Sequence, residues 1–280
     1  MSIERRRQGD LAKGLITGLA LAFAAGPASA GDDTARPAQN AAPADSCIAL
    51  SSLSDLVAGR RPAALFDTDP FHLVIDAGHG GRDPGAVLPQ AAGNEKDVTL
   101  HVATELAAAL SDDDAIHVSL IREADVYVDL AERVRRANSF APSLLISLHT
   151  GATDGAYAPP ISIRVLSEDG RRRFDDALQA RGVDRPADYW ARRSAAEALF
   201  ITELLDASDS TPLAGASGDA DSGASAGSCT VQARNYYVLS ADAPSVLIEL
   251  AGDGIDAPGA EALNEIVAQI ARAVRALAED

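Results

Sequence analysis

The stretch from residue 71 to residue 100 decides the fold, and it reads FHLVIDAGHGGRDPGAVLPQAAGNEKDVTL. Its apolar run Leu73–Ile75 predicts a buried strand, and the glycines of the AGHGG that follows let a backbone turn tightly and approach a ligand closely. Glu95 then opens a segment whose apolar residues recur at helical spacing: Val98, Val102, Leu106 and Leu110. We therefore expect His79 on a loop at the exit of a strand and Glu95 at the start of a helix.

Strands and helices alternate along the rest of the chain. Apolar runs predict further strands over residues 116–121, 144–148, 161–166, 236–239 and 245–248. Amphipathic spacing predicts helices over residues 95–110, 128–139, 191–205 and 260–277, and weaker helical spacing over 47–66. This alternation indicates an α/β domain with a largely parallel sheet, whose ligand sites collect at the carboxyl ends of the strands.

Four residues stand at strand or helix ends of that kind, namely His79, Glu95, His149 and Glu249. Two imidazoles and one carboxylate can hold Zn²⁺ and leave a position open for water. A further carboxylate is then needed as the base that takes the proton of this water, and Glu249 suits that role by its place after an apolar strand. The other histidines fall within predicted strands or a helix and are expected to be structural: His72, His101 and His117.

The composition excludes two kinds of partner. The chain has 280 residues and a net charge of -17. Such an acidic chain would not neutralise phosphates, so we expect no nucleic-acid partner and no electrostatic adsorption to an anionic membrane. Its length suffices for one well-filled core, which we place in a single domain over residues 47–280.

Residues 1–30 have the pattern of an export signal. The basic run Arg5–Arg7 precedes an apolar segment, Leu15–Ala25, and Ala28–Ala30 has the small-x-small pattern of signal cleavage. Because the apolar segment is short for a membrane span, we expect cleavage after about Ala30 rather than an uncleaved anchor. The mature protein would then be periplasmic or secreted, with no membrane span, and the arginine run does not decide between the general and twin-arginine export routes.

Three further segments carry weaker signals. Residues 31–46 are rich in Ala, Pro and Asp, which predicts a disordered linker, and the Ser/Gly/Ala/Asp tract over residues 206–228 predicts a mobile loop. Residues 168–190 are charged and arginine-rich, and we expect them to form an inserted helical or irregular segment.

The chain has two cysteines, Cys47 and Cys229, which in an exported protein invite a disulfide, although two independent thiols are the alternative.

Three blocks of the sequence resemble the zinc-dependent, type-3 N-acetylmuramoyl-L-alanine amidases of bacterial cell walls. They are IDAGHGGRDPGAV with NEKDVTL (75–100), READ through LLISLH (122–149), and QARNYYVL with PSVLIE (232–249). The resemblance extends over about residues 71–277. It implies a three-layer α/β/α sandwich around a mainly parallel six-stranded sheet. It also implies that His79, Glu95 and His149 are the zinc ligands and that Glu249 is the catalytic carboxylate.

The expected activity is hydrolysis of the amide between N-acetylmuramic acid and L-alanine in peptidoglycan. Two places depart from the family pattern: His149 is followed by Thr150-Gly151, and Glu249 by LAGD (250–253). These departures keep open a catalytically inactive wall-binding or regulatory module. A zinc carboxypeptidase acting on wall peptides is the other alternative, and it would need an anchor for a free carboxylate such as Arg122 or Arg164. Segment 168–190 lies where some division amidases carry an insert that blocks the groove until an activator protein binds, which makes an activator a candidate partner.

Overall fold

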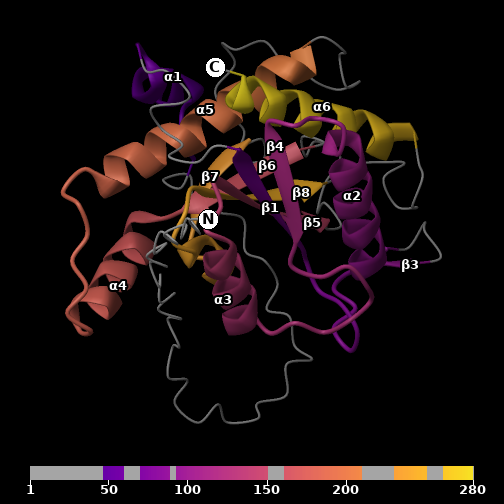
Figure 1. The fold of residues 1–280 in the computed structure, drawn as a ribbon, viewed down its shortest axis with the longest axis horizontal. Coiled ribbons are helices and arrows are strands. Elements are labelled where there is room, and N and C mark those ends of the chain that lie inside the picture. Colours follow the sequence, from indigo (N-terminus) through magenta and orange to yellow (C-terminus); the bar gives the residue numbers. More distant parts are fainter. Residues whose placement is uncertain are drawn as a thin grey trace, which may run out of the picture.

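The computed structural model describes residues 47–59, 70–88, 93–150, 161–209, 230–250 and 261–279. Its centre is a six-stranded sheet (Figure 1). In spatial order the strands are β4 (Ile116–Leu120), β1 (Phe71–Ala77), β5 (Leu144–Thr150), β8 (Ser245–Leu250), β6 (Ile161–Leu166) and β7 (Val231–Arg234). The first four run parallel, whereas β6 is antiparallel to β8 and parallel to β7. The predicted mainly parallel six-stranded sheet is thus confirmed.

Helices cover both faces of this sheet. One face carries α2 (Glu95–Leu110), α5 (Tyr189–Asp209) and α6 (Glu261–Ala278), with the short α1 (Leu50–Val57) packed on α5 (Figure 1). The other face carries α3 (Leu130–Phe140) and the 3-10 helix η3 (Tyr237–Ser240), against which α4 (Glu168–Gln179) packs. A two-stranded ribbon of β2 (Val87–Leu88) and β3 (Gly93–Asn94) precedes α2. The predicted three-layer arrangement is confirmed.

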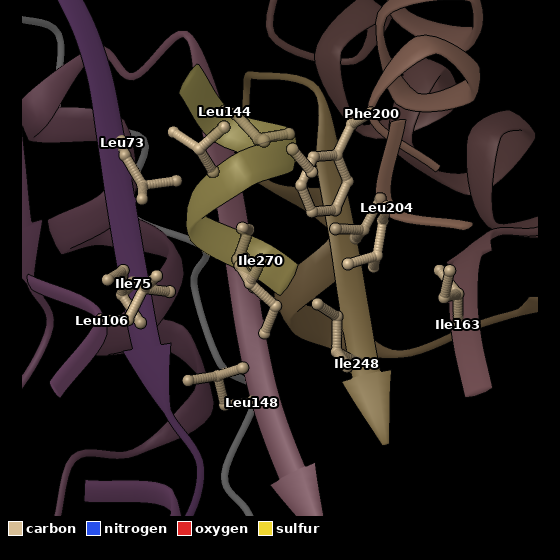
Figure 2. Close-up of a cluster of buried hydrophobic side chains, with 14 of the residues drawn as sticks. Leu73, Ile75, Leu106, Leu144, Leu148, Ile163, Phe200, Leu204, Ile248 and Ile270 are labelled. Atoms are coloured by element: carbon tan, nitrogen blue, oxygen red, sulfur yellow. The ribbon is translucent and has the colours of Figure 1, made fainter. Parts of the chain in front are cut away.

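The core follows the two-residue period of the strands. Leu73 and Ile75 point to the face covered by α2, α5 and α6, while Val74 between them points to the α3 face. Figure 2 shows the larger of the two clusters, in which side chains from the strands meet Leu106, Phe200, Leu204 and Ile270. Because both faces of β1 and β5 are covered, their sequences are continuous apolar runs rather than alternating ones.

One strand was predicted in the wrong place. The apolar run 236–239 was expected to form a strand, but η3 occupies Tyr237–Ser240 and the strand is β7, just before it. β7 is an edge strand of mixed polarity, so its sequence carries little apolar signal. The run 236–239 is apolar because Val238 and Leu239 are buried on the α3 face of the sheet.

Other expectations need new boundaries. α5 extends to Asp209, so residues 206–209 belong to a helix, and the rest of the predicted mobile loop lies outside the described residues. Segment 168–190 consists of α4, a turn and the first residues of α5. The predicted export signal (1–30) and linker (31–46) also lie outside the described residues. Within the part of the chain that is described, no helix is both long and apolar enough to cross a membrane.

The lead-in is attached to the edge of the sheet. Cys47 is disulfide-bonded, in agreement with the expected bridge, although Cys229 itself lies outside the described residues. The backbone of Cys47 also pairs with that of Gln232 of β7 in an isolated antiparallel β-bridge. The Ile48 backbone N–H donates to the Val231 carbonyl at 3.0 Å. The N-terminal lead-in is therefore attached to the sheet through β7.

A buried ion pair fixes α5 against the β8 side of the sheet. Arg193 donates from Nε to Glu197 at 2.8 Å and from its terminal nitrogens to the carbonyls of Ala241 (2.7 Å) and Leu239 (2.6 Å). Glu197 in turn accepts the backbone N–H of Ser245, the first residue of β8, at 3.1 Å. Since both side chains are almost fully buried, each depends on the other for compensation of its charge.

We therefore expect Glu197→Ala to be strongly destabilising. Loss of one partner from a buried ion pair typically costs about 3–5 kcal/mol, because it leaves an uncompensated buried charge. Urea unfolding measures the change in the free energy of unfolding. Glu168→Ala is the matched control, since Glu168 on α4 is exposed, and it should change that free energy by less than about 0.5 kcal/mol. Equal stabilities of the two variants would contradict this account.

Candidate metal centre

Three side chains from three segments converge at the carboxyl ends of β1 and β5. His79 lies two residues beyond β1, His149 is the penultimate residue of β5, and Glu95 is the first residue of α2. His79 Nε2 lies 3.1 Å from Glu95 Oε1, and His149 Nδ1 lies 2.9 Å from the same oxygen. One ligand atom from each residue falls within 4.8 Å of the others. The three predicted ligands are thus brought together.

The start of α2 holds the Glu95 carboxylate in place. A capping box between Asn94 and Asp97 begins the helix at Glu95. Glu95 Oε2 accepts the backbone N–H of Ala86 at 2.8 Å, and Glu95 Oε1 accepts the backbone N–H of Thr150 at 3.1 Å. A carboxylate with two backbone donors at a helix N-terminus is positioned before any ligand arrives.

The electrostatics of the cluster favour a negative carboxylate among imidazoles. Burial alone would raise the pKa of Glu95, but hydrogen bonds with His149 and His79 hold the pKa of this carboxyl far below its usual range. Burial alone would lower the pKa of His79, but interactions with Glu95 and Asp83 raise it. The cluster therefore favours a positive charge among the three side chains.

His79 is oriented by a carboxylate outside the cluster. Asp83 Oδ2 lies 2.9 Å from His79 Nδ1, which leaves Nε2 facing Glu95. The other oxygen of Asp83 accepts the backbone N–H of Gly85 at 3.2 Å. This arrangement matches the carboxylate–histidine pairs that fix the ring orientation of metal-bound histidines.

Two glycines make room for the cluster. A Cβ at Gly85, where φ is +68°, would lie 2.6 Å from Glu95 Oε2 and 2.7 Å from His79 Cδ2. A Cβ at Gly78 would lie 2.6 Å from His149 Cε1. His79 itself has a φ of 59°, an uncommon conformation for a residue with a side chain. Only glycine fits at the two flanking positions, because the ligand side chains occupy the space.

Arg133 holds the strained backbone that carries His79. From α3 its guanidinium donates to Asp76 Oδ1 (2.5 Å), to the Ala77 carbonyl (2.8 Å) and to the His79 carbonyl (2.5 Å). Asp76 also accepts the hydroxyl of Ser147 on β5, at 2.9 Å. All of these side chains are buried. The network therefore joins the ends of β1 and β5 to α3.

Arg122 supports the same turn from the other side. It is 2% exposed and donates to the carbonyls of Ala77 (2.9 Å), Gly78 (2.9 Å), Lys96 (2.8 Å) and Ala124 (3.1 Å). Because its donors are taken up by backbone carbonyls, Arg122 is not available as an anchor for a substrate carboxylate. This removes one of the two arginines that could have served the carboxypeptidase alternative as an anchor.

Glu249 lies beside the cluster on the neighbouring strand. In the parallel pairing of β5 and β8, His149 and Glu249 are register partners. Paired residues on adjacent strands point to the same face of a sheet, and Leu247, two residues earlier, lines the same cavity as His149. Glu249 is therefore on the face that a substrate bound at His149 would occupy.

The cavity at this site opens on the α3 face of the sheet. It is lined by Asp76, His79, Asp83, Tyr127, Val128, Leu130, Arg133, His149, Tyr236, Tyr237, Val238 and Leu247. The predicted structural histidines are elsewhere: His72 and His117 pair at the amino ends of β1 and β4. The prediction from the sequence missed Asp83, Arg133 and the tyrosines of this cavity. The GHGGRDPG run contains Asp83, but its spacing alone gives no sign that it contacts His79.

The donor set fits a zinc ion. Two imidazole nitrogens and one carboxylate oxygen are zinc ligands of the kind found in catalytic sites, where a fourth position stays open. The close approach of Gly78 and Gly85 and the low pKa of Glu95 suit a compact cation between the three side chains. Among the described residues, the cluster contains no cysteine thiolate or other soft ligand, which would favour a softer metal ion.

Comparison with known proteins agrees with this geometry. A family model described as N-acetylmuramoyl-L-alanine amidase matches residues 73–252. A probable N-acetylmuramoyl-L-alanine amidase AmiB of Haemophilus influenzae is 38% identical over 109 residues, which are 39% of this chain and 24% of that protein. An endolysin of Bacillus phage SPP1 is 39% identical over 81 residues, 29% of either chain. This chain thus spans under a third of the length of these two curated relatives.

A solved structure supports the fold. The N-acetylmuramyl-L-alanine amidase Ami1 of Mycobacterium smegmatis has a TM-score of 0.50 at 18% identity, over 74% of this chain and 96% of the other. At this identity the likeness concerns the fold alone. The family model covers well over half of the residues, including β1, α2, β5 and β8. The chain therefore belongs to the type-3 N-acetylmuramoyl-L-alanine amidase family.

Proposed function

We propose that this protein is a zinc-dependent hydrolase that cleaves the amide between the lactyl group of N-acetylmuramic acid and L-alanine in peptidoglycan. The observation that carries the proposal is the convergence of His79, Glu95 and His149, with Glu249 in register beside them. Family membership indicates the bond that is cleaved, because the family is defined by amidases of this kind.

The side chains divide the chemistry between them. His79, Glu95 and His149 would hold the ion, which when bound polarises the amide carbonyl and makes a water molecule more acidic. Glu249 takes the proton of the attacking water and then delivers it to the leaving nitrogen of alanine. The carbonyl carbon gains an oxygen and loses the nitrogen, so the products are a lactyl carboxylate and a peptide with a free amino group.

Departures from the family pattern leave the ligand geometry intact. Thr150, which follows the last ligand, is buried and donates its backbone N–H to Glu95. Any residue other than proline could supply that N–H, so the substitution does not remove a contact of the cluster. This supports an active enzyme over an inactive module. The second departure, at residues 250–253, lies mostly outside the described residues.

We also propose that the enzyme is exported to the periplasm or the medium. The support is the export-signal pattern of residues 1–30, together with a substrate that lies outside the cytoplasm. The bonded Cys47 is consistent with an oxidising compartment.

Regulation through segment 168–190 remains part of the proposal, in an indirect form. No residue of this segment lines the described part of the cavity, so α4 does not cover it. The segment instead holds η3, whose Tyr237 and Val238 do line the cavity. Arg185 donates to Asp242 Oδ1 at 2.6 Å, just after η3. An activator protein that displaced the segment would free η3 and widen the substrate site.

Glu249→Gln tests the catalytic role. We expect turnover of muramoyl-peptide to fall by a factor of about 10²–10⁴, because a general acid–base catalyst contributes that much. Bound zinc should stay at one ion per protein, since Glu249 is not a ligand. The measurements are the release of new alanine amino groups and zinc content by mass spectrometry. Glu203→Gln on α5 is the control and should be fully active, while undiminished turnover in Glu249→Gln would rule out this mechanism.

Zinc affinity tests the roles of Asp83 and the ligands. We expect Asp83→Asn to weaken zinc binding by about 10–100-fold, as loss of an outer-shell partner usually does, and His79→Ala to abolish it. A chelator should remove activity from the wild type, and added zinc should restore it. Competition with a zinc-binding dye gives the affinities, and His101→Ala on α2 is the control. Wild-type affinity in both His79→Ala and Asp83→Asn would overturn the ligand assignment.

Arg185→Ala tests the restraint of η3. If the contact between Arg185 and Asp242 favours a closed state by about 1 kcal/mol, its loss should raise turnover about fivefold. Arg172→Ala, on the exposed side of α4, should leave turnover as it is. Steady-state kinetics on soluble muramoyl-peptide compares the three proteins. Identical kcat and KM in Arg185→Ala and wild type would remove the case for regulation through this segment.

A further inference from the structure

Arg82 places a positive charge at the rim of the cavity. It is exposed, and its guanidinium carbon lies 4.1 Å from the ring centroid of Tyr127. Tyr127 in turn lines the cavity together with His79 and His149. The guanidinium of Arg82 therefore stacks on a ring that lines the same cavity as two of the proposed metal ligands.

Hydrogen bonds on both sides of Arg82 restrain the backbone of its turn. Gly80 and Asp83 exchange two backbone hydrogen bonds, of 2.9 and 3.2 Å, so that Arg82 sits in a closed turn. The backbone N–H of Gly81 donates to Asp125 at 2.6 Å, and Lys96 binds the other oxygen of that carboxylate at 2.6 Å. The guanidinium is thus presented at a defined place rather than on a loose loop.

The carboxylates around Arg82 already have other partners. Asp83 contacts His79, and Asp125 contacts Lys96 and Gly81. Among the residues that the structure describes, no carboxylate lies within ion-pair distance of Arg82. In a chain with 41 acidic and 24 basic residues, a guanidinium left without a carboxylate beside the site is available to an anionic ligand.

We propose that Arg82, stacked on Tyr127, forms a subsite for a carboxylate of the stem peptide. This rests on the proposed amidase function. The lactyl carboxyl of the sugar is used up in the scissile amide, so the carboxylates of an uncleaved muramoyl-peptide belong to its peptide part. A guanidinium offers a carboxylate two parallel N–H donors. Stacking on Tyr127 orders this fork before the substrate binds, which lowers the entropic cost of binding.

A matched pair of substrates tests the subsite. Both are soluble N-acetylmuramoyl-L-alanyl peptides, one with a free α-carboxylate on the residue after alanine and one with that group as a carboxamide. We expect the wild type to favour the carboxylate substrate about tenfold in kcat/KM, mostly through KM, as hydrogen bonds to a charged group suggest. Arg82→Gln should lose this preference and cleave the carboxamide substrate as the wild type does.

Further variants separate the stacking from a general effect of charge. Tyr127→Phe should keep the preference, because the ring remains, whereas Tyr127→Ala should weaken it. Arg172→Gln on α4 removes an exposed arginine far along the chain from the site and should behave as wild type. An equal preference in Arg82→Gln and wild type would overturn the subsite while the amidase function stood.

A binding measurement keeps the two proposals distinguishable. Calorimetric titration with the free L-alanyl peptide, as carboxylate and as carboxamide, needs no turnover. Tighter binding of the carboxylate form by wild type, lost in Arg82→Gln, supports the subsite even if neither substrate is cleaved. Absence of cleavage by the wild type would defeat the amidase proposal, and equal binding of the two peptides would defeat the subsite.

Discussion

The buried contact between Arg133 and the end of β1 is the constraint on which the rest of the site depends. Its guanidinium joins Asp76, Ala77 and His79 at distances of 2.5–2.8 Å. A charged pair of this kind is costly to desolvate and is stable only when every donor is used. Here the donors hold a backbone that turns through a positive φ at His79. The ion pair thus stabilises the unfavourable backbone conformation of His79.

Parallel pairing of the strands explains why distant residues meet. β1, β5 and β8 are adjacent strands that run in the same direction, so their carboxyl ends lie at the same end of the sheet. This brings His79, His149 and Glu249 together although up to 170 positions separate them in the sequence. The crossover helix α2 starts at the same edge and supplies Glu95 with its capped N-terminus. Glu95, His149 and Glu249 therefore lie on regular elements, whereas His79 lies two residues beyond the end of β1.

The sequence predicted what depends on local pattern and missed what depends on tertiary contact. Buried strands and the convergence of His79, Glu95 and His149 could be predicted, because apolar runs and their ends are visible in the sequence. The edge strand β7 was missed because its residues are only half-covered, and η3 was mistaken for a strand because tertiary burial made it apolar. Asp83, Arg133 and Tyr127 act through contacts between separate elements, which no spacing in the sequence reveals.

The central claim is that a preformed cluster of two histidines and one glutamate holds a zinc ion. X-ray absorption at the zinc edge, on purified protein loaded with one equivalent of zinc, tests it most directly. The account predicts about four nitrogen or oxygen neighbours at about 2.0–2.1 Å, with the scattering signature of two imidazoles that falls to one in His149→Ala. A sulfur shell, or an unchanged spectrum in His149→Ala, would contradict the assignment of His79, Glu95 and His149 as the ligands.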